Sequence, residues 1–582
     1  MAFFFDVTRG ARLLSPGLGR SLRPSWADAV ALLLLAALAV LAVHGVMRMR
    51  VPLAVLEARP MPLDLARLPF YALLTTLRMF AALAVSLVFT FVVGTLAARS
   101  RRAAALIVPA LDILQSVPVL GFLSFTVSFF MGWFPGSQLG VECAAVFAIF
   151  TSQAWNMTFS FYQSLRTVPA DLDEVARQFG FSRRQRFLRL DLPFAMPGLI
   201  WNTMMSMSGG WFFVVASEAI TVGDTTVALP GIGSWLAQAI AQEDLRAIGW
   251  AVLAMAVVIL LYDQLVFRPV VTWADKFRVE LTAASSRPRS WVYALIRRTQ
   301  WLRLPFALIG RLLQWLAEVG PRPAPRAPAV ERPPGVLSRW LWRGAVAAVC
   351  GWAAWLLADF AVTHLSVAQV GQVLWLGCLT LLRVTVLLVL ASLLWVPVGV
   401  WVGMRPAWAQ RVQPVAQFLA AFPANVLFPF AVMAIVGWHL DPEVWLSPLM
   451  VLGTQWYILF NVIAGASAIP ADLKEAAQVF GLRGWQRWRR LILPAILPFY
   501  VTGALTAAGG SWNASIVAES ISWGERHLQA TGLGAYIAQA TEQGDTVAVA
   551  LGVIVMSVFV LGFTHLLWRP LYRVAERRFR VA

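Results

Sequence analysis

Charged residues are scarce in this chain of 582 residues, where they make up 13% of the sequence. About a quarter of an average soluble domain is charged. Hydrophobic residues account for 59%, and the mean hydropathy is +0.71. This composition excludes a disordered protein, a collagen-like fibre and an ordinary soluble enzyme.

Cysteine, histidine and lysine are also rare. The cysteines Cys143, Cys350 and Cys378 lie in apolar sequence without metal-ligand spacing, so neither a disulfide framework nor a zinc site is implied. The five histidines are scattered and indicate no metal or acid–base site. Neither lysine, Lys276 or Lys474, follows a glycine as a phosphate-binding P-loop requires. We therefore expect no metal, no cofactor bound by this chain, no catalytic residues and no ATP hydrolysis by the chain itself.

Long apolar runs dominate the rest of the sequence. A helix needs about 20 apolar residues to cross a bilayer, and twelve such spans are predicted, six in each half of the chain. In the first half they lie near 27–47, 72–98, 104–132, 139–164, 198–222 and 247–267. In the second half they lie near 343–363, 374–404, 412–437, 443–465, 499–522 and 546–568.

Arginine placement predicts the orientation of these spans. Basic residues outnumber acidic ones by 47 to 29, which in a membrane protein marks cytoplasmic loops. Four arginines precede the first span, so both termini and the loops 165–197 and 466–497 are expected in the cytoplasm. The arginines at 48, 50, 59 and 67 fall on the other side and are inconsistent with this rule.

The second half of the chain repeats the first. A shift of 301 residues places Pro169-Ala-Asp-Leu172 on Pro470-Ala-Asp-Leu473, and upstream a shift of 305 pairs Arg78 with Arg383. Each repeat has an even number of spans, so the two repeats are parallel and related by an axis along the membrane normal. The predicted domains are a first repeat, 1–268, a basic, proline-rich connector, 269–342, and a second repeat, 343–582. The connector is either a tether or carries an interfacial helix over 291–319.

A long basic loop follows the fourth span of each repeat, over 166–197 and 467–498. In the first loop, acidic residues open a short helix, where the helix dipole favours them, and Gly180 ends it. Ser182 and Gln185 form a capping-box pattern that starts a second helix. The second loop has the same pattern without the serine cap. We expect a helix–glycine–helix unit whose small alanines, Ala176 and Ala477 among them, allow close approach to a partner.

The spacing in both loops resembles the cytoplasmic "EAA" loop of ABC-importer permeases, which docks into a groove on the ATP-binding subunit. Val175 departs from the usual alanine. The coupling residues that this resemblance implies are Glu174, Ala176, Gly180, Leu192 and Pro193 in the first copy, and Glu475, Ala476, Ala477, Gly481, Leu493 and Pro494 in the second.

A second motif narrows the resemblance. Trp211 and Glu218 before Gly231-Ile-Gly233, matched by Trp512 and Glu519 before Gly532-Leu-Gly534, look like a stretch of the nitrate/sulfonate/taurine-type permeases. The resemblance to fused, duplicated permeases of that group implies an all-α integral membrane protein of the type I ABC-importer permease fold. It also implies a bacterial inner-membrane location, two ATP-binding subunits that carry ATP and Mg, a periplasmic or lipid-anchored solute-binding protein, contact with membrane lipids, and no nucleic acid. One chain would supply both permease halves, and the solute would be a small anion.

Polar residues inside spans are costly and therefore mark a transport path or a structural bond. Glu218 and Glu519 are expected either in a structural or gating hydrogen bond or in contact with the path. Arg78 and Arg383 are candidates for anion attraction, or interfacial anchors. The serines and glycines either line the path or allow close helix packing. The candidate path or gate residues are Gln153, Asn156, Ser208, Trp211, Glu218, Gln455, Asn461, Ser511, Trp512, Asn513 and Glu519.

Two other functions fit part of this pattern. Twelve spans in two parallel halves also suit a secondary transporter driven by an ion gradient, and a membrane scaffold or receptor without transport is a third hypothesis. The paired glutamate–glycine–leucine–proline loops and the lack of an acid–base relay favour the ATP-driven importer. The sequence does not name the solute.

Overall fold

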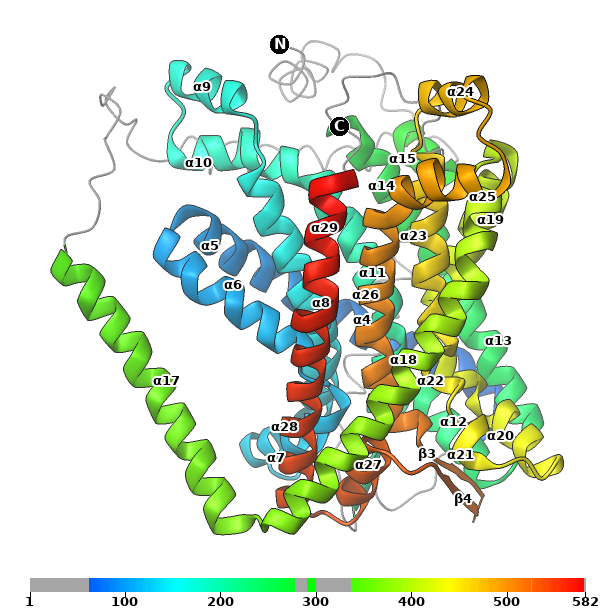
Figure 1. Ribbon diagram of the computed structural model, residues 1–582. Helices are drawn as coiled ribbons and strands as arrows, with labels where there is room; N and C mark the ends of the chain where they lie inside the picture. The colour runs from blue at the N-terminus through cyan, green and yellow to red at the C-terminus, as the bar shows by residue number, and fades with distance from the viewer. Residues whose placement is uncertain (1–61, 223–224, 278–289, 300–335, 525, 580–582) are drawn as a thin grey trace.

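The computed structural model describes residues 62–222, 225–277, 290–299, 336–524 and 526–579, which form an almost wholly helical bundle (Figure 1). The predicted span near 27–47 and most of the connector 269–342 lie outside these residues. The boundaries predicted for the domains therefore stay predictions.

The first repeat opens with the 3-10 turn η1 (Leu65–Arg67) and a long span built from α4 (Leu68–Phe89), the π turn η2 (Thr90–Gly94) and α5 (Thr95–Arg99). It continues with α6 (Arg101–Ser116), η3 (Leu120–Phe122), α7 (Leu123–Trp133), α8 (Gln138–Arg166), α9 (Ala170–Gln178), α10 (Arg183–Arg186), η4 (Phe187–Asp191) and α11 (Leu192–Glu218). Then follow β1 (Ala219–Val222), β2 (Thr225–Ala228), α12 (Ile232–Ala241), α13 (Leu245–Tyr262), η5 (Asp263–Phe267), α14 (Arg268–Ala274) and η6 (Asp275–Phe277). The short helix α15 (Trp291–Arg298) lies in the connector.

The second repeat has a similar order of elements. Its helices are α17 (Val336–His364), α18 (Val367–Gly403), α19 (Pro406–Ala421), η7 (Ala424–Leu427), α20 (Phe428–Gly437), α21 (Pro442–Trp445), α22 (Leu449–Leu452), α23 (Gln455–Ser467), α24 (Ala471–Val479), α25 (Gly484–Arg487), η8 (Trp488–Ile492) and α26 (Leu493–Ala518). Then follow β3 (Ser520–Trp523), β4 (Arg526–Gln529), α27 (Leu533–Glu542), α28 (Thr546–Phe563), η9 (Thr564–Trp568) and α29 (Arg569–Phe579). The helices α21, α22 and α23 stand in the place of the single helix α8.

Six helices of the described residues are long and apolar enough to cross a membrane, and two bent helix pairs bring the number to as many as eight. The predicted spans near 104–132, 139–164 and 198–222 are also largely helical, but they are too short or too polar by the same measure. The polar helices α8 and α11 pack against each other inside the first repeat. Their lower apolar content therefore reflects burial in the bundle.

Two predicted spans are wrong as single helices, because a proline breaks each of them. The span near 104–132 is interrupted before Pro118, and the one near 412–437 before Pro423, where the two helices meet at 81°. Val117 and Phe422, which precede these prolines, have extended ψ angles of 127° and 125°. A residue before proline is excluded from the helical region by the proline ring, so each span ends there and restarts as a second helix. The predicted span near 443–465 is likewise divided, into α21, α22 and α23.

The predicted spans near 198–222 and 499–522 also end too late. Helix α11 stops at Glu218 and α26 at Ala518, and each chain then forms a two-stranded antiparallel hairpin. In the second hairpin Ser520 pairs with Gln529, and Gly524 in the turn has a φ of +55°. Such a φ favours glycine, so the turn chemistry overrides the apolar run.

The bundle has two distinct ends (Figure 1). The hairpins α9–α10 and α24–α25 stand well apart at one of them, which we call the hairpin end. The strands β3 and β4 and the helices α12 and α27 lie at the other, the strand end. There the repeats touch, since the backbone N–H of Gly524 donates to the carbonyl of Ile240 at 3.2 Å. The two repeats therefore meet at the strand end and present separate hairpins at the hairpin end.

Candidate functional site

Arg78 on α4 is the centre of a buried ion cluster near the strand end of the first repeat. Its Nε and Nη2 donate to Glu142 on α8 at 2.6 and 2.7 Å, and its Nη1 donates to Glu218 at 2.7 Å and to the carbonyl of Pro230 at 2.9 Å. The three charged side chains are between 0% and 5% exposed. Burying a charged side chain without a partner costs much free energy. The two carboxylates around one guanidinium compensate for this cost through charge-assisted hydrogen bonds.

The second repeat has the same cluster at the corresponding positions, around Arg383 on α18. Arg383 donates to Glu519 at 3.3 Å, to the carbonyl of Thr531 at 2.8 Å, and to Glu443 on α21. Here the cluster reaches the surface, because the side chains of Arg383 and Glu443 are 16% and 43% exposed. The two clusters are built from corresponding residues of the two repeats but differ in their exposure to solvent.

Glu218 and Glu519 also bind the first turn of the following helix, α12 or α27, where two glycines lie. Glu218 accepts from the N–H of Gly233 at 2.7 Å, and Glu519 accepts from that of Gly534 at 2.7 Å. A Cβ atom added to Gly231 would lie 2.3 Å from the carboxylate of Glu218, and the counterpart at Gly532 would be as close to Glu519. The glycines are therefore required by close approach, and a carboxylate at a helix N-terminus is favoured by the helix dipole. The motif of tryptophan, glutamate and two glycines ties α11 or α26 to the next helix.

Two positions of the ion cluster in each repeat were not predicted from the sequence. Thr75 accepts from the N–H of Ile232 at 2.9 Å, and Thr380 accepts from that of Leu533 at 2.9 Å. The other missed pair is Glu142 with Glu443. Both pairs obey the repeat shifts, which was the signal available in the sequence.

The burial of Arg78 contradicts the role that the sequence predicted for this residue. With its side chain 0% exposed and held by two carboxylates, Arg78 is neither an interfacial anchor nor a group that could attract anions from solvent. Arg383 is partly exposed but is likewise paired with Glu443 and Glu519.

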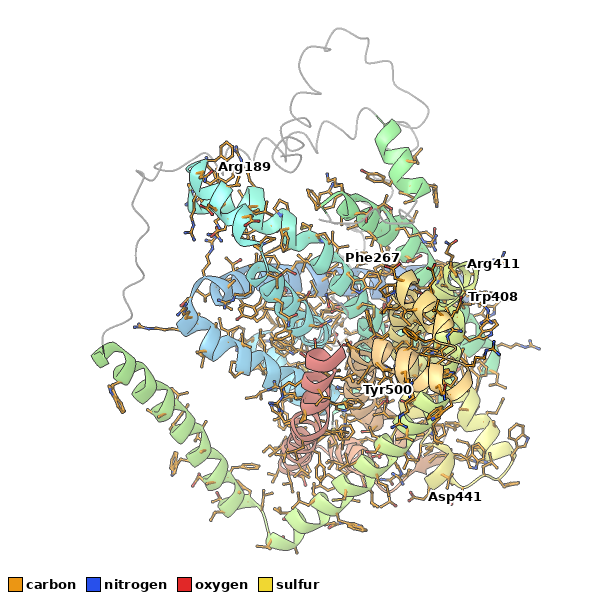
Figure 2. All side chains as sticks on the ribbon, turned by 45° about the horizontal axis from the view of Figure 1, so that its top comes forward. Arg189, Phe267, Trp408, Arg411, Asp441 and Tyr500 are labelled. Carbon is orange, nitrogen blue, oxygen red and sulfur yellow. The ribbon has the colours of Figure 1, made fainter. Side chains whose placement is uncertain are left out.

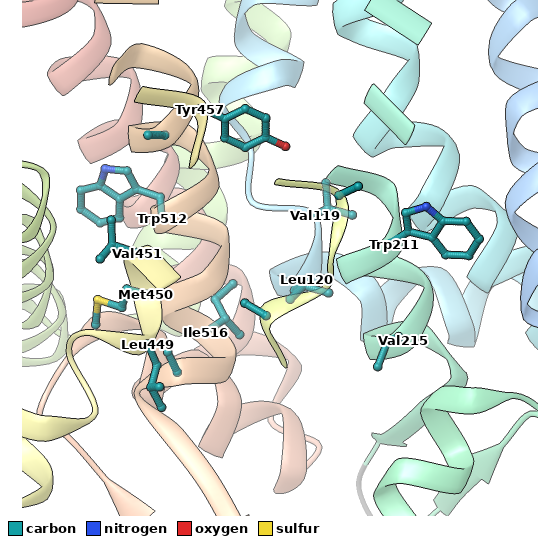
Figure 3. Close-up of a cluster of buried hydrophobic side chains, with 14 of the residues drawn as sticks. Val119, Leu120, Trp211, Val215, Leu449, Met450, Val451, Tyr457, Trp512 and Ile516 are labelled. Carbon is teal, nitrogen blue, oxygen red and sulfur yellow. The ribbon is translucent and has the colours of Figure 1, made fainter. Parts of the chain in front are cut away.

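The tryptophans of the motif are buried within their own repeats. Trp211 packs against Tyr262 with ring centroids 5.7 Å apart, and Trp512 against Phe559 at 6.2 Å. Figure 3 shows the two indoles turned away from each other, with Val119 drawn between them. Neither ring is more than 1% exposed, so in this conformation neither faces an open path.

Most of the other candidate path residues make hydrogen bonds inside their own repeat. Gln153 is buried and pairs with Ser86, Ser208 bonds the carbonyl of Met204, and Ser511 bonds Thr454. Asn156 donates to Ser206, Gln455 accepts from Trp395, and Asn461 donates to the carbonyl of Tyr457. These bonds explain how polar groups are tolerated between the helices, and a role in the path stays a prediction.

Asn513 is different because its bond crosses between the repeats. Its Oδ1 accepts from the backbone N–H of Val119 at 2.8 Å. At the equivalent contact on the other side of the pseudo-twofold axis, Asn425 Nδ2 donates to the carbonyl of Phe212 at 3.2 Å. Phe212 is the counterpart of Asn513 under the shift of 301 residues. Each repeat thus lays the loop at its proline break against the long helix, α11 or α26, of the other.

The hairpins at the hairpin end have the caps that the sequence predicts. Gly180 and Gly481 each have a φ of +64°. The backbone N–H of Phe181 bonds the carbonyl of Ala176 at 3.1 Å, which closes a helix C-terminus of the Schellman type. Ser182 and Gln185 exchange the two bonds of a capping box, at 2.9 and 3.2 Å.

The exposed surface of the hairpins differs from the prediction. Ala176 and Ala477 are 1% and 4% exposed, so the small residues face the hairpin interior and do not offer a contact surface. The aromatic residue before each glycine is exposed instead, to 68% for Phe179 and 79% for Phe480. The two glutamates of the motif and Leu493 are exposed, Ala476, Leu192 and Pro494 are half-buried, and Pro193 is buried. In the sequence, each of these two phenylalanines stands directly before the glycine that ends its helix, which is the signal that could have marked them.

The two hairpins are not identical. In the first, Asp173 on α9 pairs with Arg186 on α10 at 2.7 Å and braces the two helices. The counterpart of Asp173 in the second hairpin is Lys474, which cannot make this pair. Figure 2 shows Arg189, beside the first hairpin, far from Trp408 on α19 of the second repeat.

A family model described as the inner membrane component of binding-protein-dependent transport systems matches residues 90–268 and 395–580. The chain belongs to this family. Because the model matches once in each repeat, the chain is an internally duplicated permease of the type I ABC-importer fold.

Curated relatives support this membership. The chain is 27% identical over 180 residues to the nitrate import permease protein NrtB of Leptolyngbya laminosa, which is 31% of this chain and 61% of the relative. It is 28% identical over 180 residues to the bicarbonate transport system permease protein CmpB of Synechococcus elongatus, covering 31% and 62%. It is 30% identical over 174 residues to the glycine betaine/proline betaine transport system permease protein ProW of Escherichia coli, covering 30% and 45%. The chain thus spans about three fifths or less of the length of these relatives.

Proposed function

We propose that this chain supplies both permease halves of an ATP-driven importer, which moves a small solute, an anion, from a periplasmic binding protein into the cytoplasm. The observation that carries the proposal is the pair of exposed hairpins, α9–α10 and α24–α25, at one end of a duplicated bundle of the permease family. A matched pair of projections on a pseudo-twofold body suits a partner that is itself a pair.

The partners follow from the family. Two ATP-binding subunits would each receive one hairpin on the cytoplasmic side, and ATP with Mg would be bound there. Under this proposal, the hairpin end, α29 and both termini lie in the cytoplasm of a bacterial inner membrane. A binding protein, periplasmic or lipid-anchored, would deliver the solute at the strand end.

The mechanism is alternating access. When ATP draws its two subunits together, the hairpins that stand apart in this structure move toward each other, and the repeats rock about their contacts at the strand end. The bonds of Asn513 with Val119 and of Asn425 with Phe212 cross between the repeats, so they are the contacts that this motion strains. The present arrangement corresponds to the state that opens toward the hairpin end.

The names of the relatives suggest the solute to test first. NrtB and CmpB are named for nitrate and bicarbonate, and ProW for betaines. All three names denote small polar solutes, two of which are anions. Nitrate is therefore the first probe, followed by bicarbonate and glycine betaine.

The test is uptake by proteoliposomes that contain the chain, the candidate ATP-binding subunits and a candidate binding protein. We expect labelled nitrate, bicarbonate or glycine betaine to accumulate only with ATP inside the cytoplasmic compartment and the binding protein outside. A proton ionophore should leave this uptake intact. Uptake that an ionophore abolishes while ATP is present would indicate an ion-gradient-driven transporter instead, and uptake that needs no ATP-binding subunit would refute the proposal.

A further inference from the structure

The path between the repeats has two seams, one along α11 and one along α26, and they differ. Along α11, Trp201 stacks on Phe460 of the second repeat with ring centroids 5.6 Å apart. Gln417 Nε2 lies 2.8 Å from the sulfur of Met204. Farther along the helix, Asn425 bonds the carbonyl of Phe212. Contacts between the repeats thus recur over about three turns of α11, although Trp201 itself is 39% exposed.

Tyr457 extends this packing. A Cβ atom on Gly209 would lie 3.5 Å from its hydroxyl oxygen. Figure 3 shows the ring of Tyr457 pointing from the second repeat toward the side where Val119 and Trp211 are drawn.

The corresponding face of α26 is open. Trp201, Met205, Ser208 and Phe212 of α11 correspond to Thr502, Thr506, Gly509 and Asn513 of α26. Thr502 and Thr506 are exposed, and a Cβ atom on Gly509 would meet nothing within 4 Å. The stack of Trp201 on Phe460 cannot form here, because threonine replaces the tryptophan.

One end of this open face lies at the contact between the repeats. Residues at spacings of four, three and four share one helix face, which is the spacing from Thr502 to Asn513. Asn513 ends this face with its bond to Val119 of the first repeat.

Helices of the same repeat cover the other faces of α26. Tyr500 (Figure 2) bonds Ser392 on α18 at 3.1 Å. The Cα of Gly503 approaches α23, since a Cβ there would lie 2.7 Å from the carbonyl of Tyr457. The exposed threonines thus face neither of these neighbours.

We propose that the solute leaves along α26 of the second repeat alone, and that Thr502, Thr506 and Asn513 are its specificity-determining contacts. The inference rests on the proposed transport function. The face carries no charged residue between Thr502 and Asn513. The hydroxyls of Thr502 and Thr506 donate to the carbonyls of Pro498 and Thr502, and the amide of Asn513 donates one N–H to that of Gly509. The face thus offers a solute the hydroxyl oxygens and the second N–H of the amide. It therefore recognises a small polar solute by hydrogen bonds, and no fixed charge holds the solute back from release.

Cysteine accessibility tests the open face without knowledge of the solute. In the full chain, with its three native cysteines replaced by serine, single cysteines are placed as Thr506→Cys and Gly509→Cys. The matched controls on α11 are Met205→Cys and Ser208→Cys. Membrane fragments open on both sides are treated with a charged maleimide that does not enter lipid.

We expect the two α26 positions to react on the order of tenfold faster than their α11 counterparts, because thiol labelling follows exposure to water. Equal rates at the matched positions would overturn the one-sided path. So would labelling of the α26 positions by a lipid-soluble maleimide alone, which would place the face against lipid.

A measurement of ATP-driven uptake is the second part of the test. We expect Thr506→Trp to lower ATP-driven uptake by about tenfold or more, since pore width limits passage, while Thr506→Ser keeps it. Uptake by Thr506→Trp equal to that of the unchanged chain would overturn the path. If the unchanged chain takes up no probe with ATP, the proposed function fails, and the labelling contrast still decides whether the α26 face is open.

Discussion

The two ion clusters offer a test in which one repeat controls for the other. Glu142 and Glu443 occupy corresponding positions and bind corresponding arginines, but the Glu142 side chain is 5% exposed and that of Glu443 is 43% exposed. The change is the same in both places, glutamate to glutamine, which removes one charge and keeps the shape. A difference in the result then reflects the surroundings of the two glutamates, of which burial is the main difference.

The expected magnitudes differ several-fold. Breaking a buried ion pair costs about 3–5 kcal/mol. We expect Glu142→Gln to fall near the lower figure, about 3 kcal/mol, because Glu218 still compensates Arg78. An exposed pair contributes about 0–1 kcal/mol, so Glu443→Gln should cost no more than that.

The assay is equilibrium unfolding of the detergent-solubilised chain in increasing SDS, followed by tryptophan fluorescence. Size-exclusion profiles of both variants confirm that they start from the same folded state. Equal losses of unfolding free energy in the two variants would refute the reasoning, as would a larger loss for Glu443→Gln. Either result would mean that burial does not set the strength of these clusters.

Three further changes test other parts of the structure. Gly231→Ala would place a Cβ atom 2.3 Å from the carboxylate of Glu218, so we expect a loss of about 2 kcal/mol or more in the same unfolding assay, whereas Gly249→Ala, with nothing within 4 Å, should be neutral or slightly stabilising. Gly180→Ala together with Gly481→Ala puts side chains at a φ of +64°, which costs about 1–2 kcal/mol at each site, and we expect lower ATP-driven uptake together with a lower free energy of unfolding, measured by uptake and SDS unfolding. Asn513→Ala removes the bond to Val119, so uptake without ATP should rise.

The sequence predicted those features that local chemistry or the repeat decides. The caps of the first hairpin follow from Gly180 and from the pairing of Ser182 with Gln185, and both are seen in the structure. The duplication follows from identities at a fixed shift, and the family model confirms it. Such features need only a few neighbouring residues, or a comparison of the chain with itself.

Two helix breaks were missed although local chemistry decides them, and other features were missed because they depend on contacts between distant segments. Apolarity could not show that the chain breaks before Pro118 and Pro423, although the extended residue before each proline explains it. The alanines of the hairpins were expected outside, and burial of Ala176 became visible only with the fold of the hairpin. Glu142 was overlooked because one charge in a long polar helix gives no pattern of its own.

The differences between the repeats carry more functional information than their likeness. Identical halves would close both seams alike, and a solute would meet two equivalent walls. Here the ring of Trp201, itself 39% exposed, stacks on Phe460 across one seam, whereas an exposed threonine, Thr502, stands at the same position of the other. Fusing the halves into one chain is what allows such differences to persist, because each position of a fused protein mutates alone, whereas a homodimer changes both copies at once. The threonine–tryptophan exchange is therefore the difference between the repeats on which the proposed one-sided path rests.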